Sequence, residues 1–146
     1  MKTIKLEDLL GEHWLDAVDY NTVQRESWTG RLTDANSITF RLDGVCYTAI
    51  EDPDDGYRST MEELIVDDDV TMKNVFNPTW VLCRPSEPKR EYYSSEHSND
   101  DGIELIEFVD VWNGEVILVV GTDHSDQWYP VFVSNWIPEN MAVNRG

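Results

Sequence analysis

Carboxylates are the side chains in this sequence best placed to do chemistry, and they gather in one stretch. Between Asp43 and Asp69 the chain has ten acidic residues and one basic residue, Arg58. A large field of one sign is more typical of a surface that attracts an oppositely charged partner than of an ordinary solvated face. The candidate partner-binding residues are Asp43, Glu51, Asp52, Asp54, Asp55, Glu62, Glu63, Asp67, Asp68 and Asp69, with Tyr57 beside them.

Carboxylates on a rigid sheet can imitate the phosphates of a nucleic acid. Duplex DNA has one charge per about 1.7 Å of its axis, and closely set Asp and Glu approach that density. Lys and Arg of a partner would pair with them through charge-assisted hydrogen bonds. Aromatic anchors would strengthen such an interface, although core packing is the alternative for each of them; the candidates are Tyr57, Trp80, Tyr92 and Tyr93. The expected partner is a basic nucleic-acid-binding protein.

Residues 51–62 also match part of an EF-hand calcium loop. Asp55, Gly56 and Glu62 fall at its fifth, sixth and twelfth positions. However, Pro53 takes a ligand position, Arg58 adds a positive charge, and the flanking residues favour strands over helices. A type I turn therefore explains the Asp-Pro-Asp-Asp-Gly segment better. No metal site is predicted, and calcium binding stays an alternative.

The motifs of common enzymes do not occur in the sequence. Only Asp123-His124-Ser125-Asp126 places an imidazole among carboxylates, and such a cluster after Gly121 more often forms a turn. There is no phosphate-binding loop, nucleophile elbow or zinc-protease helix motif. Cys46 and Cys83 have apolar neighbours, as buried thiols do, and a disulfide is not expected. We expect a protein that is not an enzyme and needs no cofactor.

The chain as a whole has the size and composition of one folded domain, residues 1–146. It has 146 residues, 40% of them hydrophobic, and a net charge of −18 that divides into −10 for residues 1–73 and −8 for residues 74–146. An acidic surface repels nucleic acids and anionic membranes, so direct binding to either is not expected. No apolar run is long enough to span a bilayer and the N-terminus lacks a signal-peptide core, which predicts a cytoplasmic protein.

Two β-hairpins are the clearest elements that would position these residues. Residues 37–42 alternate apolar and polar side chains, Asp43-Gly44 follows, and residues 45–50 are β-branched or aromatic. Residues 105–112 and 115–121 flank Asn113-Gly114, a pair typical of a two-residue type I′ turn.

Weaker patterns complete the expected fold. Leu6, Leu9 and Leu10 have helical spacing before Gly11, with Thr3 as a candidate N-cap. Residues 13–20 alternate imperfectly, residues 75–83 predict a strand interrupted by Asn77-Pro78, and residues 127–137 predict a strand that starts at a sheet edge and stops before Pro138. Residues 84–101 predict a long loop. The expected fold class is mostly β (α+β), an antiparallel twisted sheet or partly open barrel with a short N-terminal helix.

The stretch from Phe40 to Ser59, with Val120-Gly121-Thr122-Asp123 and Tyr129-Pro130, resembles small acidic proteins of unassigned function that are encoded in bacteriophages and prophages. Phages encode many small acidic inhibitors of host defence nucleases. The resemblance therefore implies an anti-CRISPR or anti-restriction role in the host cytoplasm, and it transfers no site residues.

Together these observations predict a phage-type inhibitor that binds its target stoichiometrically with an acidic, DNA-mimicking surface. The alternative is a non-enzymatic ligand- or Ca²⁺-binding structural module whose acidity serves solubility. Adaptation to high salt and an enzyme of unrecognised type are the remaining hypotheses.

Overall fold

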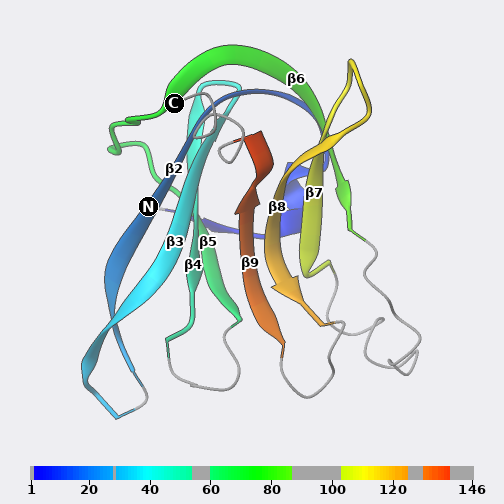
Figure 1. Cartoon of the computed structure of the whole chain (residues 1–146). Coiled ribbons are helices and arrows are strands. Elements are labelled where there is room, and N and C mark those ends of the chain that lie inside the picture. Colours follow the sequence, from blue (N-terminus) through cyan, green and yellow to red (C-terminus); the bar gives the residue numbers. More distant parts are fainter. Residues whose placement is uncertain (1, 28, 54–59, 87–102, 125–129, 139–146) are drawn as a thin grey trace.

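The strands of the described residues form one open antiparallel sheet of nine strands. The structure is a computed structural model that describes residues 2–27, 29–53, 60–86, 103–124 and 130–138. The strands lie in the order β1-β5-β4-β3-β2-β6-β7-β8-β9, with β1 and β9 at the edges (Figure 1). The strands are β1 (Lys2–Ile4), β2 (Gly11–Glu26), β3 (Leu32–Leu42), β4 (Val45–Glu51), β5 (Met61–Val66), β6 (Val75–Pro85), β7 (Leu105–Asp110), β8 (Val116–Asp123) and β9 (Val131–Trp136). The mostly β prediction is confirmed, and the sheet does not close into a barrel.

The predicted N-terminal helix is wrong. Leu6–Leu9 form one short 3₁₀ turn, in which the side chains of Leu6 and Leu9 are buried. Thr3 is not its N-cap, because it belongs to β1 and pairs with Ile65 of β5. Within the described residues, no helix has the length and apolar character needed to cross a membrane.

Both predicted hairpins are present, but only the first has the predicted turn. Asp43 and Gly44 have φ angles of 53° and 81°, as a type I′ turn requires. In the second hairpin Asn113 does not have a positive φ, and residues 111–115 form a wider loop between β7 and β8. The Asn113 side-chain oxygen accepts the N–H of Glu115 at 2.9 Å, and Gly114 N–H reaches Asp110 O at 2.8 Å. These local hydrogen bonds stabilise the wider loop, so the two-residue turn was a wrong prediction.

Irregular pairing occurs in two long strands. The pairing of β2 with both neighbours shifts between Leu15 and Ala17, so Asp16 is the extra residue of a β-bulge. This bulge explains why the alternation fails at residues 17 and 18. β6 continues through Asn77-Pro78, although its pairing with β2 jumps from Val75 to Thr79. Figure 1 shows β6 arching over one end of the molecule and connecting the two halves of the sheet.

The C-terminal strand lies at a sheet edge, as predicted. β9 starts directly after Pro130 and pairs only with β8 among the described strands. Residues 127–129, the predicted start of the strand, lie outside the described residues. So does most of the predicted loop 84–101, of which only residues 84–86 are described and residues 84 and 85 belong to β6.

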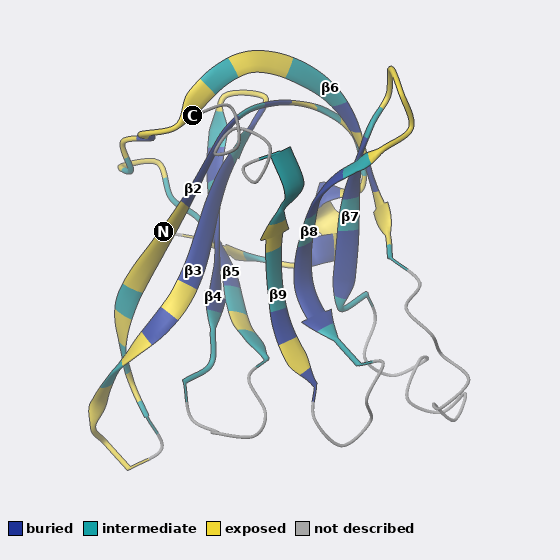
Figure 2. Ribbon diagram, viewed as in Figure 1, coloured by how far each residue is buried: buried dark blue, intermediate teal, exposed yellow. Residues whose placement is uncertain are grey.

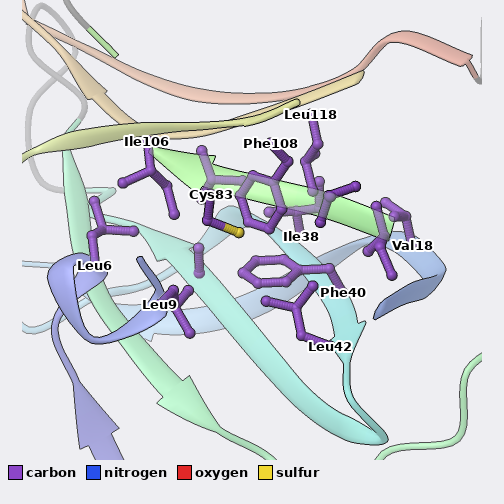
Figure 3. Packing of buried hydrophobic residues seen from close by; sticks show 14 of the residues in the cluster. Leu6, Leu9, Val18, Ile38, Phe40, Leu42, Cys83, Ile106, Phe108 and Leu118 are labelled. Atoms are coloured by element: carbon purple, nitrogen blue, oxygen red, sulfur yellow. The ribbon is translucent and has the colours of Figure 1, made fainter. Parts of the chain in front are cut away.

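The main core lies where the sheet curls over itself. Phe40 of β3 meets Phe108 of β7 edge to face, with ring centroids 5.2 Å apart. Leu6, Leu9 and Cys83 close the same cluster (Figure 3). Besides the β2–β6 pairing, two hydrogen bonds among the described residues join strands from the two halves of the sheet: Met61 N–H to Thr122 Oγ1 at 2.9 Å and Trp136 N–H to Tyr20 Oη at 2.7 Å. Figure 2 shows buried residues along much of β3, β7 and β8, and exposed ones along the arch of β6 and at the lower ends of β2 and β3.

Candidate functional site

The predicted acidic surface is divided between the two ends of the β4–β5 hairpin. Tyr47 near the start of β4 pairs with Val66 at the end of β5, so the β3–β4 turn and the segment after β5 share one end. The turn-end acids are Asp43, Asp67, Asp68 and Asp69, and the far-end acids are Glu51, Asp52, Glu62 and Glu63. At about 3.4 Å per residue, β4 separates the two groups by about 20 Å. Asp54, Asp55 and Tyr57 lie outside the described residues.

Asp43, in the β3–β4 turn, is oriented by two hydrogen bonds to residues of β2. Its Oδ2 is 2.6 Å from Nδ1 of His13, and its Oδ1 accepts the N–H of Trp14 at 2.9 Å. Burial acts to raise the pKa of Asp43, but the Trp14 N–H and His13 outweigh it, so the pKa is lowered. Nε2 of His13 lies 2.8 Å from Leu9 O, and a protonated imidazole would donate to both acceptors. Asp43 is therefore held in the charged form.

The segment that follows β5 carries three consecutive acids and is tied to β2. Asp19 is only 4% exposed and accepts the N–H groups of Lys73 and Asn74 at 2.7 and 2.9 Å. Met72 packs with Ala17 and Cys46 in a small cluster. These contacts hold residues 67–74 against the outer side of the sheet. They therefore fix the backbone that carries Asp67, Asp68 and Asp69.

The electrostatic effects of the turn-end acids converge near Cys46 and Tyr47. Burial, followed by the charges of Asp43 and Asp68, raises the pKa of Tyr47. Burial also raises the pKa of Cys46, against the opposing charge of Arg41 and with contributions from Asp67, Asp16 and Asp68. Asp43 and Asp68 therefore both lie close enough to Tyr47 to raise its pKa.

The far-end acids are partly neutralised. Arg25 contacts Glu63 through its Nη2, and its Nε lies 3.2 Å from Oε2 of Glu62. Oε1 of Glu51 accepts the N–H of Asn36 at 3.1 Å. Glu62, which would be a ligand in the calcium-binding alternative, is therefore paired with the guanidinium of Arg25. The described residues contain no group of three or more His, Cys, Asp or Glu suited to hold a metal ion.

Two tryptophans, the exposed Trp14 and the half-buried Trp80, form a pair next to the turn-end acids. Trp14 of β2 pairs with Trp80 of β6, and their ring centroids are 4.6 Å apart. Trp14 is 50% exposed, Trp80 donates its indole N–H to Glu12, and exposed Leu82 and Val111 lie on the neighbouring positions. We call Trp14, Trp80, Leu82 and Val111 the tryptophan face. Contiguous exposed apolar side chains with a polar rim are typical of interaction sites.

Only part of the tryptophan face was predicted. Trp80 was a candidate anchor, whereas Tyr92 and Tyr93 lie outside the described residues and Trp14 was missed. The signal for Trp14 was available, because it alternates with buried Leu15 and so must point away from the core. The partner across the strands, Trp80, could not be found from sequence because it depends on the β2–β6 register.

A polar pocket of about 260 Å³ opens between β9 and strands β2, β3 and β4. Its lining residues are Tyr20, Asn21, Thr22, Asn36, Ser37, Glu51, Phe132 and Ser134. Of these only Glu51 was a predicted site residue. The other seven come from three strands, β2, β3 and β9, and sequence patterns do not reveal that β9 folds back over β2.

The remaining reactive side chains are the two cysteines and His124. Cys46 and Cys83 are free, buried thiols, and burial together with the charge of Asp43 raises the pKa of Cys83 to about 12. A thiol with such a pKa is almost entirely protonated at neutral pH and is a poor nucleophile. His124 Nε2 lies 2.9 Å from Oε1 of Glu104, a pairing that the Asp123–Asp126 motif did not predict. Ser125 and Asp126 lie outside the described residues.

Comparisons with known protein families, with characterised proteins and with solved structures found no significant match.

Proposed function

We propose that this protein inhibits a host nucleic-acid-binding defence protein, a CRISPR or restriction effector, by stoichiometric binding in the host cytoplasm. Its acidic surface would occupy the basic groove of that protein in place of DNA. The observation that carries the proposal is the uncompensated charge, 29 acidic against 11 basic residues. The resemblance to acidic phage proteins stays a prediction, and it suggests the class of partner.

The turn-end acids are the best supported contact residues. Three arginines of the described chain already pair with other carboxylates: Arg25 with Glu62 and Glu63, Arg41 with Asp16, and Arg84 with Glu107. Among the described residues, Asp67, Asp68 and Asp69 form no salt bridge. Their charges are therefore available to Lys and Arg of a partner.

The tryptophan face supports an apolar centre for the same interface. Trp14 is joined to the turn-end acids through its N–H bond to Asp43. Trp and Tyr dominate the binding energy of many protein interfaces, and indole rings also attract Arg side chains through cation–π contacts. Acids beside a tryptophan pair would therefore combine long-range attraction with a desolvated anchor for a basic protein.

The experiment that tests the proposal is capture of partners from bacterial lysate at low and at high salt, with identification by mass spectrometry. A basic nucleic-acid-binding protein should be captured, be released as ionic strength rises, and be displaced by duplex DNA. A partner that resists salt, or one that duplex DNA does not displace, would contradict the DNA-mimic proposal.

Charge variants then locate the contact. Asp67→Asn/Asp68→Asn/Asp69→Asn should weaken binding to the captured partner by about tenfold or more, since close charge pairs have coupling energies of about 1.5 kcal/mol and above. The matched control is Glu26→Gln/Asp34→Asn/Glu115→Gln, which removes the same charge from exposed positions elsewhere. Equal losses in both variants would mean that only net charge matters and that the turn-end acids are not the contact.

A second candidate function is favoured by the polar pocket. A non-enzymatic ligand-binding module, whose acidity serves solubility, would use such a hollow between strands. This candidate would be supported if a small molecule binds in the pocket and no basic protein is captured.

A further inference from the structure

The polar pocket lies where three neighbouring strands change from apolar to polar on their inward side. On β2 the inward positions run from Val18 in the core to Tyr20 and Thr22, because alternate residues share a face. On β3 they run from Phe40 and Ile38 to Asn36. The inward-facing apolar residues of the core therefore end at the same height of the sheet on β2 and on β3.

The third strand follows the same change. On β4, Ala49 belongs to the core, and Glu51 two residues later lines the pocket. Thr22 pairs with Asn36, and Asn36 N–H donates to Glu51 Oε1 at 3.1 Å. Thr22, Asn36 and Glu51 thus form a continuous polar row across three strands. Coordinated departures from the core pattern are expected at functional sites, which tolerate a local cost in stability.

The edge strand β9 supplies the opposite wall of the pocket. Phe132 and Ser134 line it from β9, and the bond from Trp136 N–H to Tyr20 Oη holds β9 against β2. The pocket therefore has two aromatic rings, that of Tyr20 from β2 and that of Phe132 from β9, together with hydroxyl and amide groups. The volume of about 260 Å³ exceeds the roughly 10–15 Å³ that one water needs and is enough for one small molecule.

The charge of the lining selects the class of ligand. Among the described residues that line the pocket, Glu51 is the one ionic side chain, and none of these eight is Lys, Arg or His. A carboxylate with no cation among its described neighbours in the pocket favours a positively charged occupant. A single carboxylate is too few for Ca²⁺, which takes six to eight oxygen ligands and usually several carboxylates. Aromatic faces beside the carboxylate instead suit an organic ammonium group.

We propose that the polar pocket binds a small organic cation, a primary or quaternary ammonium compound. Its nitrogen would lie against Glu51 and the oxygens of the polar row, and its carbon atoms would contact the rings of Tyr20 and Phe132. This inference is independent of the inhibitor proposal, and it assigns a ligand class to the second candidate function.

The test is titration of the whole chain with choline and with putrescine, followed by calorimetry and by amide NMR shifts. Measurements in about 0.5 M NaCl, where the Debye length lies between about 3 and 8 Å, suppress diffuse attraction to the acidic surface. Binding should shift the amide signals of Thr22, Asn36 and Ser134. Shifts spread over the whole acidic surface, or no binding of either compound, would overturn the proposal.

Two variants and one control sharpen the result. Glu51→Gln keeps an oxygen for the Asn36 N–H, so the fold is retained, and it should weaken binding at least about tenfold because the charge is lost. Glu115→Gln removes the same charge from an exposed turn and should change binding less than about twofold. Phe132→Leu should weaken choline binding more than putrescine binding, because a quaternary ammonium depends more on the ring.

The outcomes separate this site from the partner surface. The pocket proposal would be overturned if Glu51→Gln and Glu115→Gln weakened choline binding equally. It would also be overturned if both variants bound glucose, an uncharged compound, as tightly as they bind choline. Asp67→Asn/Asp68→Asn/Asp69→Asn lies at the other end of β4 and should leave ammonium binding within about twofold. Loss of partner capture in that variant, with ammonium binding intact, would place the two activities at different sites.

Discussion

Replacement of Asp19 by Asn should loosen the segment that carries Asp67, Asp68 and Asp69. The Asp19 carboxylate is 4% exposed on β2, and each of its oxygens accepts one backbone N–H, from Lys73 and from Asn74. An asparagine side chain has one oxygen and one NH₂ group. One of the two backbone N–H groups would therefore face a donor in place of an acceptor.

The magnitude follows from these two bonds. A hydrogen bond to a charged group contributes about 1.5–3 kcal/mol, and a buried N–H left without an acceptor costs about 1–3 kcal/mol. Because Asn keeps one bond in weaker, neutral form, Asp19→Asn should lower the free energy of unfolding by about 2–4 kcal/mol. Asp34→Asn, an exposed position on β3, is the matched control and should change it by less than about 0.5 kcal/mol.

Urea unfolding measures the stability, and cysteine labelling in native conditions reports the local effect. Cys46 packs with Met72 under the segment, so iodoacetamide should label Cys46 faster in Asp19→Asn than in the unmodified protein. Cys83 lies in the main core, and its slow labelling should not change. If Asp19→Asn matches Asp34→Asn in stability and leaves Cys46 labelling unchanged, Asp19 does not anchor this segment.

Two further predictions concern the β8 strand and the β3–β4 turn. In a thermal unfolding assay, Gly121→Ala should lower the free energy of unfolding by about 2–4 kcal/mol, because φ is 137° and a Cβ would overlap Glu104 O. The control in the same assay is Gly114→Ala, which should lower it by only about 1 kcal/mol, because φ is 75° and the space around the new Cβ is open. The folded-state pKa of Asp43 is lowered, so its stabilising contribution is present above its unfolded pKa of about 3.9 and is lost as the pH falls through the folded value. The difference in urea midpoint between the unmodified protein and Asp43→Asn should therefore shrink in acid, and a constant difference down to the lowest pH at which the protein folds would contradict the assigned shift.

Local chemistry was enough to predict most of the strands. Asp43-Gly44 supplies the positive φ angles that its turn needs, and Pro130 correctly placed the start of β9 at an edge. At the N-terminus, where the prediction failed, a tertiary contact decided. Leu6 and Leu9 have helical spacing, yet a single 3₁₀ turn is enough to bury both side chains under the curled sheet. Thr3, the predicted N-cap, pairs with β5 instead. At Asn113, side-chain hydrogen bonding produced a wider loop than the residue pair suggested.

The candidate site shows the same division. The sequence by itself determined that acids concentrate between Asp43 and Asp69 and that the charge is far from balanced, because charge is a property of composition. Only the tertiary structure separated these acids into two groups about 20 Å apart, brought Trp14 against Trp80, and placed β9 over Glu51. Strand order and register join residues that are distant along the chain, and the alternation within one strand holds no information about which strand lies beside it.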